Sequence, residues 1–198
     1  YYLNGRLAMM SENLLLGGIL VAVVLGLFLN LKVACWVIIG IPISFAGAFW
    51  LMPSFDVTIN VMSLFAFIMV LGIVVDDAIV IGESVYREVT SDYENKLAAG
   101  VEDADTYSAS IATVVAGTKR VAIPSTIGVL TTMAAFLPVV FAGGSFDGIT
   151  RALGIVVILC LAFSLIESKL ILPAHLVGLK IGEKSTGISG HIDRCRAH

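Results

Sequence analysis

Long apolar runs separated by short polar stretches dominate this chain. A helix needs about 20 mostly apolar residues to cross a bilayer, and we assign five such spans. They lie at residues 14–29, 33–52, 61–86, 121–141 and 149–172. The pattern therefore predicts an all-α integral membrane protein, in which a bundle of five transmembrane helices occupies residues 14–173.

Polar segments at both ends of the chain frame this bundle. Residues 1–13 are expected to form a periplasmic or interfacial lead-in, and residues 174–198 a polar cytoplasmic tail. Two prolines stand where spans are expected to stop, because Pro53 follows the second span and Pro173 the fifth. Since the chain does not begin with Met and has no signal peptide pattern, we expect it to be an internal piece of a longer protein.

A longer polar segment, residues 87–120, separates the third and fourth spans. Its first part is acidic, whereas its second part, residues 104–118, has the spacing of an amphipathic helix. We predict a short amphipathic helix at the cytoplasmic membrane surface; a solvated helix within the loop would have the same pattern. The positions that share one face are Ala104, Ser108, Ile111, Ala112 and Val115.

Composition supports a membrane protein and excludes several other classes. Apolar residues make up 58% of the chain and charged residues 14%, with a mean hydropathy of +0.98, against about 45–50% and 25% in soluble domains. A chain of this size cannot bury such an excess in one core. The net charge of −3 and the absence of a basic stripe argue against nucleic-acid binding. The three cysteines have neither zinc-site nor CxxC spacing.

The distribution of Lys and Arg predicts the orientation of the chain, because cytoplasmic loops carry the excess of these residues. With five spans, the loops on one side hold only Arg6 and Arg151. We therefore expect a periplasmic N-terminus and a cytoplasmic C-terminus. The loops and tail on the other side hold Lys32, Arg87, Lys96, Lys119, Arg120, Lys180, Lys184, Arg194 and Arg196.

Two adjacent acids, Asp76 and Asp77, interrupt the third span. At about 1.5 Å per residue, they lie roughly 22 Å from one end of the span and 15 Å from the other. An Asp at the centre of a membrane helix costs about 2.5–3.5 kcal/mol for insertion, whereas a Leu or Val returns only about 0.3–0.6. Ionisable residues in such positions are functional by default. We therefore predict a site that loads and releases protons, with at least one acid protonated near neutral pH unless a cation lies close.

The pair has two other possible interpretations. Protonated aspartates can act as hydrogen-bonding groups that hold neighbouring helices together. Intramembrane aspartyl proteases also use two aspartates, but their acids face each other across a shared proton. Adjacent residues on one helix diverge by about 100°, and no Ser–His or HExxH arrangement lies within the spans. We therefore expect no enzyme.

Other polar residues within the spans have weaker assignments. Glu83 is expected to be a snorkelling or capping group rather than a member of the relay. Thr131 and Thr132 could hydrogen-bond an acid on a neighbouring helix, or equally their own backbone. Glu167 and Lys169, in the last turns of the fifth span, are expected to form an interfacial ion pair. The histidines form no set of metal ligands.

The stretch Gly72-Ile-Val-Val-Asp76-Asp77-Ala-Ile-Val-Ile-Gly-Glu83-Ser-Val resembles the fourth-helix motif of resistance-nodulation-division (RND) efflux transporters, in the branch that exports hydrophobic and amphiphilic compounds. Further segments resemble neighbouring helices of that family, in the same order, from about Arg6 to Lys180. They are Phe28-Leu-Asn-Leu-Lys-Val, Ile41-Pro-Ile-Ser, Ser63-Leu-Phe-Ala-Phe, Thr131-Thr132-Met-Ala-Ala-Phe-Leu-Pro138, Phe141-Ala-Gly-Gly144 and Leu172-Pro-Ala-His175.

The resemblance implies helices two to six of the N-terminal half of a twelve-helix permease in a bacterial inner membrane. Asp76 and Asp77 match the family's two proton-binding acids, with protons as the coupling ion and no other cofactor. The family's partner lysine lies in the C-terminal half, outside this chain. Further implied partners are membrane lipids, that second half, and a homotrimer that docks to a periplasmic adaptor and an outer-membrane channel.

Departures from the family pattern keep a second function open. Ser84 stands where multidrug pumps tend to carry Asn, and the segment containing Glu167 and Lys169 is more charged than their sixth helix. The alternative is a member of the same superfamily that exports proteins or handles lipids, or a membrane scaffold that transports nothing.

Overall fold

The computed structural model describes residues 12, 15–23, 26, 31–100, 107–141 and 147–180. This part of the chain is helical throughout its regular elements and contains no strand, which confirms the all-α prediction for the described residues. Residues 15–23 are helical. The elements that follow are α2 (Leu31–Leu51), the 3₁₀-helix η1 (Met52–Phe55), α3 (Val61–Ala98), α4 (Ile111–Phe141), α5 (Asp147–Ile166), the π-helix η2 (Glu167–Ile171) and α6 (Leu172–Leu176).

Four helical stretches of the described chain are long and apolar enough to cross a membrane. They are Lys32–Phe55, Val61–Ala98, Ile111–Phe141 and Thr150–Leu176, and they correspond to the second to fifth expected spans. The first expected span, residues 14–29, falls partly outside the described residues, as do most of the lead-in and of the tail.

The start of α3 is fixed by its own sequence. Asn60 is the N-cap residue, and its Oδ1 accepts hydrogen bonds from the backbone N–H groups of Met62 and Ser63, both at 2.9 Å. The Ser63 hydroxyl bonds in return to the Asn60 backbone. This reciprocal capping box satisfies backbone donors that would otherwise be unpaired. It begins the helix at Val61, where the sequence pattern begins the third span.

The far end of α3 requires a correction to the expected loop. The helix continues beyond Tyr86 to Ala98, because no Gly or Pro interrupts this stretch and pairs such as Lys96–Asp92, at 3.3 Å, connect successive turns. Gly100, with a φ of 68°, follows in the left-handed conformation that commonly terminates helices.

The amphipathic helix expected between the third and fourth spans is likewise corrected. Ile111–Thr118 is not a separate element but the first part of α4. Its Gly117 packs against α3, since a Cβ there would come within 2.7 Å of the Val85 Cα. Tertiary packing on α3 thus continues the helix through a residue with a low helix propensity. The beginning of the expected helix, residues 104–106, lies outside the described part.

The sequence pattern predicts that the last helix ends at Pro173, and this expectation is the third to be corrected. The helical path runs from α5 through η2 and α6 to Leu176. A proline inside a helix removes one hydrogen bond and crowds the carbonyl four residues earlier. Here the preceding turn widens into the π-helix, and the Leu172 N–H donates to the Glu167 carbonyl, five residues back.

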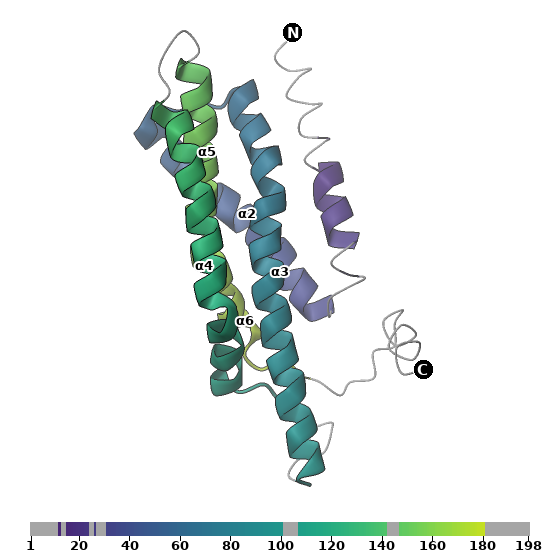
Figure 1. The fold of residues 1–198 in the computed structure, drawn as a ribbon. Coiled ribbons are helices and arrows are strands. Elements are labelled where there is room, and N and C mark those ends of the chain that lie inside the picture. The colour runs from purple at the N-terminus through teal and green to yellow at the C-terminus, as the bar shows by residue number, and fades with distance from the viewer. Residues whose placement is uncertain are drawn as a thin grey trace, which may run out of the picture.

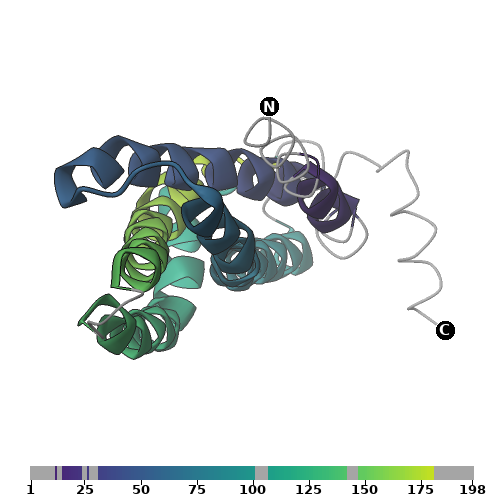
Figure 2. The same ribbon diagram turned by 90° about the horizontal axis from the view of Figure 1, so that it is seen from above.

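The helices form a bundle in which α3, α4 and α5 run side by side (Figure 1). Figure 2 shows α2 crossing this group at a steep angle, against α5 and α3. Phe67 of α3 is fully buried where it contacts α2, stacked on Phe49 at 4.2 Å between ring centroids and edge-on to Phe45 at 5.2 Å. Gly154 brings α5 close to α4, since a Cβ there would lie 2.7 Å from the Val140 side chain. Such close approach through small residues is typical of membrane helices.

Candidate functional site

The carboxylate of Asp77 is enclosed at the junction of α3, α4 and η2. Only 3% of its side chain is exposed. The hydroxyl of Ser125, on α4, donates to Oδ1, and the hydroxyl of Ser168, on η2, donates to Oδ2 at 2.6 Å. Three elements distant in sequence therefore meet at one buried acid.

A cation completes this cluster. The Nζ atom of Lys169 lies 3.7 Å from the Asp77 Oδ2 and donates to the Ser125 hydroxyl oxygen at 3.2 Å. Ser125 thus accepts from the ammonium and donates to the carboxylate. A buried ion pair becomes tolerable when further hydrogen bonds satisfy its atoms, and the two serines supply them here. We call Asp77, Ser125, Ser168 and Lys169 the enclosed cluster.

The π-helix positions two members of the enclosed cluster. Ser168 and Lys169 are consecutive, yet both reach the Oδ2 atom of Asp77. They lie in η2, where Pro173 disturbs the regular hydrogen-bond ladder. Single π-turns inside α-helices occur frequently at functional sites. The π-helical backbone, rather than a loop, therefore brings the Ser168 hydroxyl and the Lys169 ammonium to Asp77.

Asp76 lies on a different face of α3. It is exposed, as are Gly72 one turn before it and Val80 one turn after it, and a Cβ added at Gly72 would have no atom within 4 Å. We call Gly72, Asp76 and Val80 the open stripe. The adjacent acids predicted from the sequence are thus separated by the helix geometry, with one enclosed by the bundle and the other uncovered.

The three weaker candidates make other contacts. The hydroxyls of Thr131 and Thr132 donate to carbonyls four residues earlier in α4, at 2.7 and 3.1 Å, which is the backbone alternative considered above. Glu83 forms an exposed ion pair with Arg87, at 2.6 Å. None of the three is bonded to Asp77.

The expected Glu167–Lys169 ion pair is wrong, because Lys169 pairs with Asp77 instead. Residues two apart on a helix do not face each other. Glu167 is buried, with 2% exposed, and its carboxylate packs against Gly40 of α2, where a Cβ would collide with it. Asp77 thus has a cationic partner within this chain, while the family's partner lysine in the C-terminal half stays an expectation.

Sequence reasoning missed Ser125, Ser168 and the partner of Lys169. One signal was available, since Lys169 lies well inside an expected span, whereas Arg151 stands at the start of the same span, and a buried cation needs an anion. The serines gave no such signal, because hydroxyls in membrane helices commonly bond to their own backbone.

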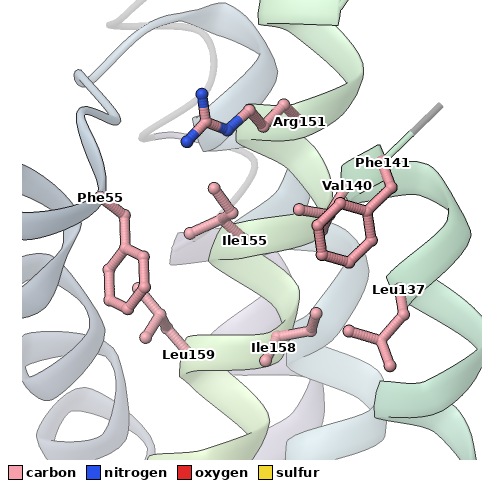
Figure 3. Close-up of a pocket in the computed structure, with 8 residues that line it drawn as sticks. All are labelled: Phe55, Leu137, Val140, Phe141, Arg151, Ile155, Ile158 and Leu159. Atoms are coloured by element: carbon pink, nitrogen blue, oxygen red, sulfur yellow. The ribbon is translucent and has the colours of Figure 1, made fainter. Parts of the chain in front are cut away.

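A separate apolar pocket of about 600 Å³ lies between α4, α5 and η1. Figure 3 shows Arg151 at one end and apolar side chains around the rest. No member of the enclosed cluster or of the open stripe lines it. The lining residues are Phe55, Leu137, Val140, Phe141, Arg151, Ile155, Ile158 and Leu159.

Membrane-crossing helices with an ion pair enclosed between them define a multi-pass membrane protein with an intramembrane polar site. The model of the AcrB/AcrD/AcrF family matches residues 2–189, and the chain belongs to that family. The resemblance to RND efflux permeases is thereby confirmed.

Individual relatives agree with this membership. The chain is 28% identical to the toluene efflux pump membrane transporter TtgE of Pseudomonas putida, over 79% of its residues. It is 29% identical to the multidrug export protein AcrF of Escherichia coli, over 78%, and 29% identical to the swarming motility protein SwrC of Bacillus subtilis, over 83%. In each case it spans 14% of the relative's length. The family is one of transporters rather than enzymes.

Proposed function

We propose that this chain forms the proton-coupling part of an efflux permease, in which the relay formed by Asp76 and Asp77 couples proton movement to the export of substrate. The observation that carries the proposal is the contrast between the two acids. Asp77 is held in the enclosed cluster by an ion pair, while Asp76 lies on an uncovered face of the same helix. A proton antiporter needs an acid whose surroundings change during its cycle, and the open stripe offers one.

The proposal also includes the second half of the permease, its membrane location and its assembly partners. An exposed acid among apolar residues at mid-membrane calls for cover by protein or water rather than lipid. The C-terminal half of the permease, with the family's partner lysine, would cover the open stripe. We further propose a bacterial inner membrane location with a periplasmic N-terminus and a cytoplasmic C-terminus. The assembly would be a homotrimer with an adaptor and an outer-membrane channel, and protons would be the coupling ion, with no cofactor.

A second candidate differs in cargo rather than mechanism. SwrC, which is named for swarming motility rather than drug export, is 29% identical to this chain. That similarity favours a transporter of the same design whose substrate is not a drug. Export assays should therefore include surface-active and lipid-like compounds beside hydrophobic drugs.

Replacing either acid in the intact protein tests the proposed function. In Asp76→Asn or Asp77→Asn variants, export from cells should fall at least about tenfold, equivalent to about 1.4 kcal/mol, because each substitution replaces a relay carboxylate with an amide that can neither bind a proton nor carry a negative charge. Asp56→Asn is a matched control, because Asp56 is exposed and its left-handed conformation (φ 58°) suits Asn equally. Unchanged export in both test variants, at normal protein levels, would refute the proton relay.

A further inference from the structure

We propose that Lys169 is a positioning residue for the relay. It holds Asp77 as a permanently paired carboxylate within this half of the transporter, so that Asp76 is the acid that exchanges protons. The division of labour rests on the proposed function. The pairing of Lys169 with Asp77, however, can be tested without any transport.

The contacts of Asp77 leave its carboxylate fully engaged. Oδ1 accepts from Ser125, and Oδ2 accepts from Ser168 at 2.6 Å and lies 3.7 Å from the Lys169 Nζ. The Lys169 side chain is itself only 17% exposed. A proton on Asp77 would leave the ammonium buried with the Ser125 hydroxyl as its remaining acceptor. Breaking one side of a buried pair is strongly unfavourable because the other charge is left uncompensated.

Other titratable groups around the cluster do not replace Lys169. The Glu167 carboxylate packs against Gly40 of α2. The His175 ring stacks on Trp36, with centroids 4.0 Å apart, and its Nδ1 lies 2.8 Å from the Ile171 carbonyl oxygen. From Val121 to Phe141, α4 carries no ionisable residue, and on α3 the nearest other acid is Asp76 itself. Within the described chain, Lys169 is therefore the cation that balances Asp77.

Asp76 has no comparable constraint. Among the described residues, no Lys, Arg or His is within ion-pair distance of it. Protonating Asp76 would therefore leave no described cation without its partner, and the exposed face of Asp76 can contact a group that approaches and leaves during the transport cycle. The enclosed acid would thus supply a fixed negative charge beside the acid that exchanges protons.

Carbodiimide labelling of the intact protein in its membrane tests this assignment. Dicyclohexylcarbodiimide reacts with protonated carboxyl groups in apolar surroundings, and fragment-ion mass spectrometry separates the two adjacent residues. Across a pH series, we expect labelling of Asp76 that declines as pH rises, and at least about tenfold less at Asp77, the ratio for roughly 1.4 kcal/mol. Equal or stronger labelling of Asp77 would overturn the proposal.

Substitutions of Lys169 separate charge from burial. In Lys169→Met, which removes the charge but keeps an unbranched side chain, Asp77 should become labelled to a similar extent as Asp76. Lys169→Arg keeps the charge and should label like the wild type. Labelling of Asp77 that is unchanged in Lys169→Met would contradict the pairing.

A double variant keeps the test decisive if Lys169→Met does not accumulate. Combining Lys169→Met with Asp77→Asn removes both charges and leaves neither one buried alone. The double variant should therefore accumulate to a higher level than either single variant, which is the coupling expected of a charge pair. Failure of this rescue would overturn the proposal. If labelling follows the expected pattern but Asp76→Asn exports normally, the pairing stands and the proton relay fails, so the two claims can be separated.

Discussion

Two clusters of similar composition lie on α3, and their surroundings differ. In the enclosed cluster, Asp77 contacts Lys169 and two serine hydroxyls, with 3% of its side chain exposed. Near the C-terminal end of the helix, Asp92 contacts Lys96 at 3.3 Å, the Tyr107 hydroxyl at 2.8 Å and the Thr113 hydroxyl at 3.2 Å, and 30% of its side chain is exposed. We call this second set the surface cluster.

The comparison teaches that burial, more than residue type, gives an acid its role. An exposed ion pair contributes about 0–1 kcal/mol, because water solvates either charge alone. In a buried pair, loss of one partner costs about 3–5 kcal/mol. The surface cluster therefore suits an anchor that ties Tyr107 and the start of α4 to the α3 extension. In the enclosed cluster, by contrast, the charge of Asp77 depends on the position of the Lys169 ammonium.

The largest expected difference between the clusters follows removal of the two acids. Asp77→Asn strands Lys169 and should lower the free energy of unfolding by about 3–5 kcal/mol, whereas the matched Asp92→Asn should lower it by about 1 kcal/mol or less. Thermal unfolding of the detergent-solubilised intact protein measures both. Equal losses would mean that the two acids do not differ in burial as described.

A smaller difference is expected for the hydroxyl donors. Ser168→Ala removes a buried hydrogen bond to a charged group and should cost about 1.5–3 kcal/mol. Thr113→Ala removes a part-exposed one, for which about 0.5–1 kcal/mol is expected because water can replace the hydroxyl. The same unfolding assay applies, and a Thr113→Ala effect larger than that of Ser168→Ala would reverse the assignment of the two clusters.

Gly117 lies along α4 between the two clusters and sets the spacing of α3 and α4. Gly117→Ala would place a Cβ 2.7 Å from the Val85 Cα and 3.0 Å from the Ser84 carbonyl oxygen, and the Ser84 hydroxyl donates to the Gly117 carbonyl at 2.7 Å. Overpacking of this kind should cost about 1–3 kcal/mol. Gly128→Ala, on the same helix with open space at its Cβ, is the control and should stabilise the helix by about 0.5–1 kcal/mol. If Gly117→Ala left the free energy of unfolding unchanged, the contact between α3 and α4 at this position would be loose.

Local sequence patterns predicted the helices and the acids, but not the partners of the acids. Asp76 and Asp77 stand out because they break a long apolar run, and Asn60 and Ser63 mark the start of α3 through short-range chemistry. The helix end expected at Pro173 is wrong because the effect of proline on helix ends is inferred from one helix alone. The π-turn that accommodates it depends on packing around Glu167 and Ser168, both buried.

The pairing of Lys169 was missed for a related reason. It joins residues 92 positions apart in the chain (169 − 77), and only the packing of α3, α4 and η2 brings them together. Spacing alone favoured the neighbouring acid Glu167, although two residues along a helix is a poor separation for an ion pair. The exposure of Asp76 was equally invisible, since either acid could have faced the bundle.

Proton flux through the reconstituted intact protein tests the central claim most directly. In liposomes with an imposed pH gradient, we expect substrate to accelerate proton movement in the wild type and in Asp56→Asn, and to have no effect in Asp76→Asn. Substrate-coupled proton flux that persists at the wild-type rate in Asp76→Asn, with the protein correctly inserted, would contradict the assignment of Asp76 as the acid that exchanges protons.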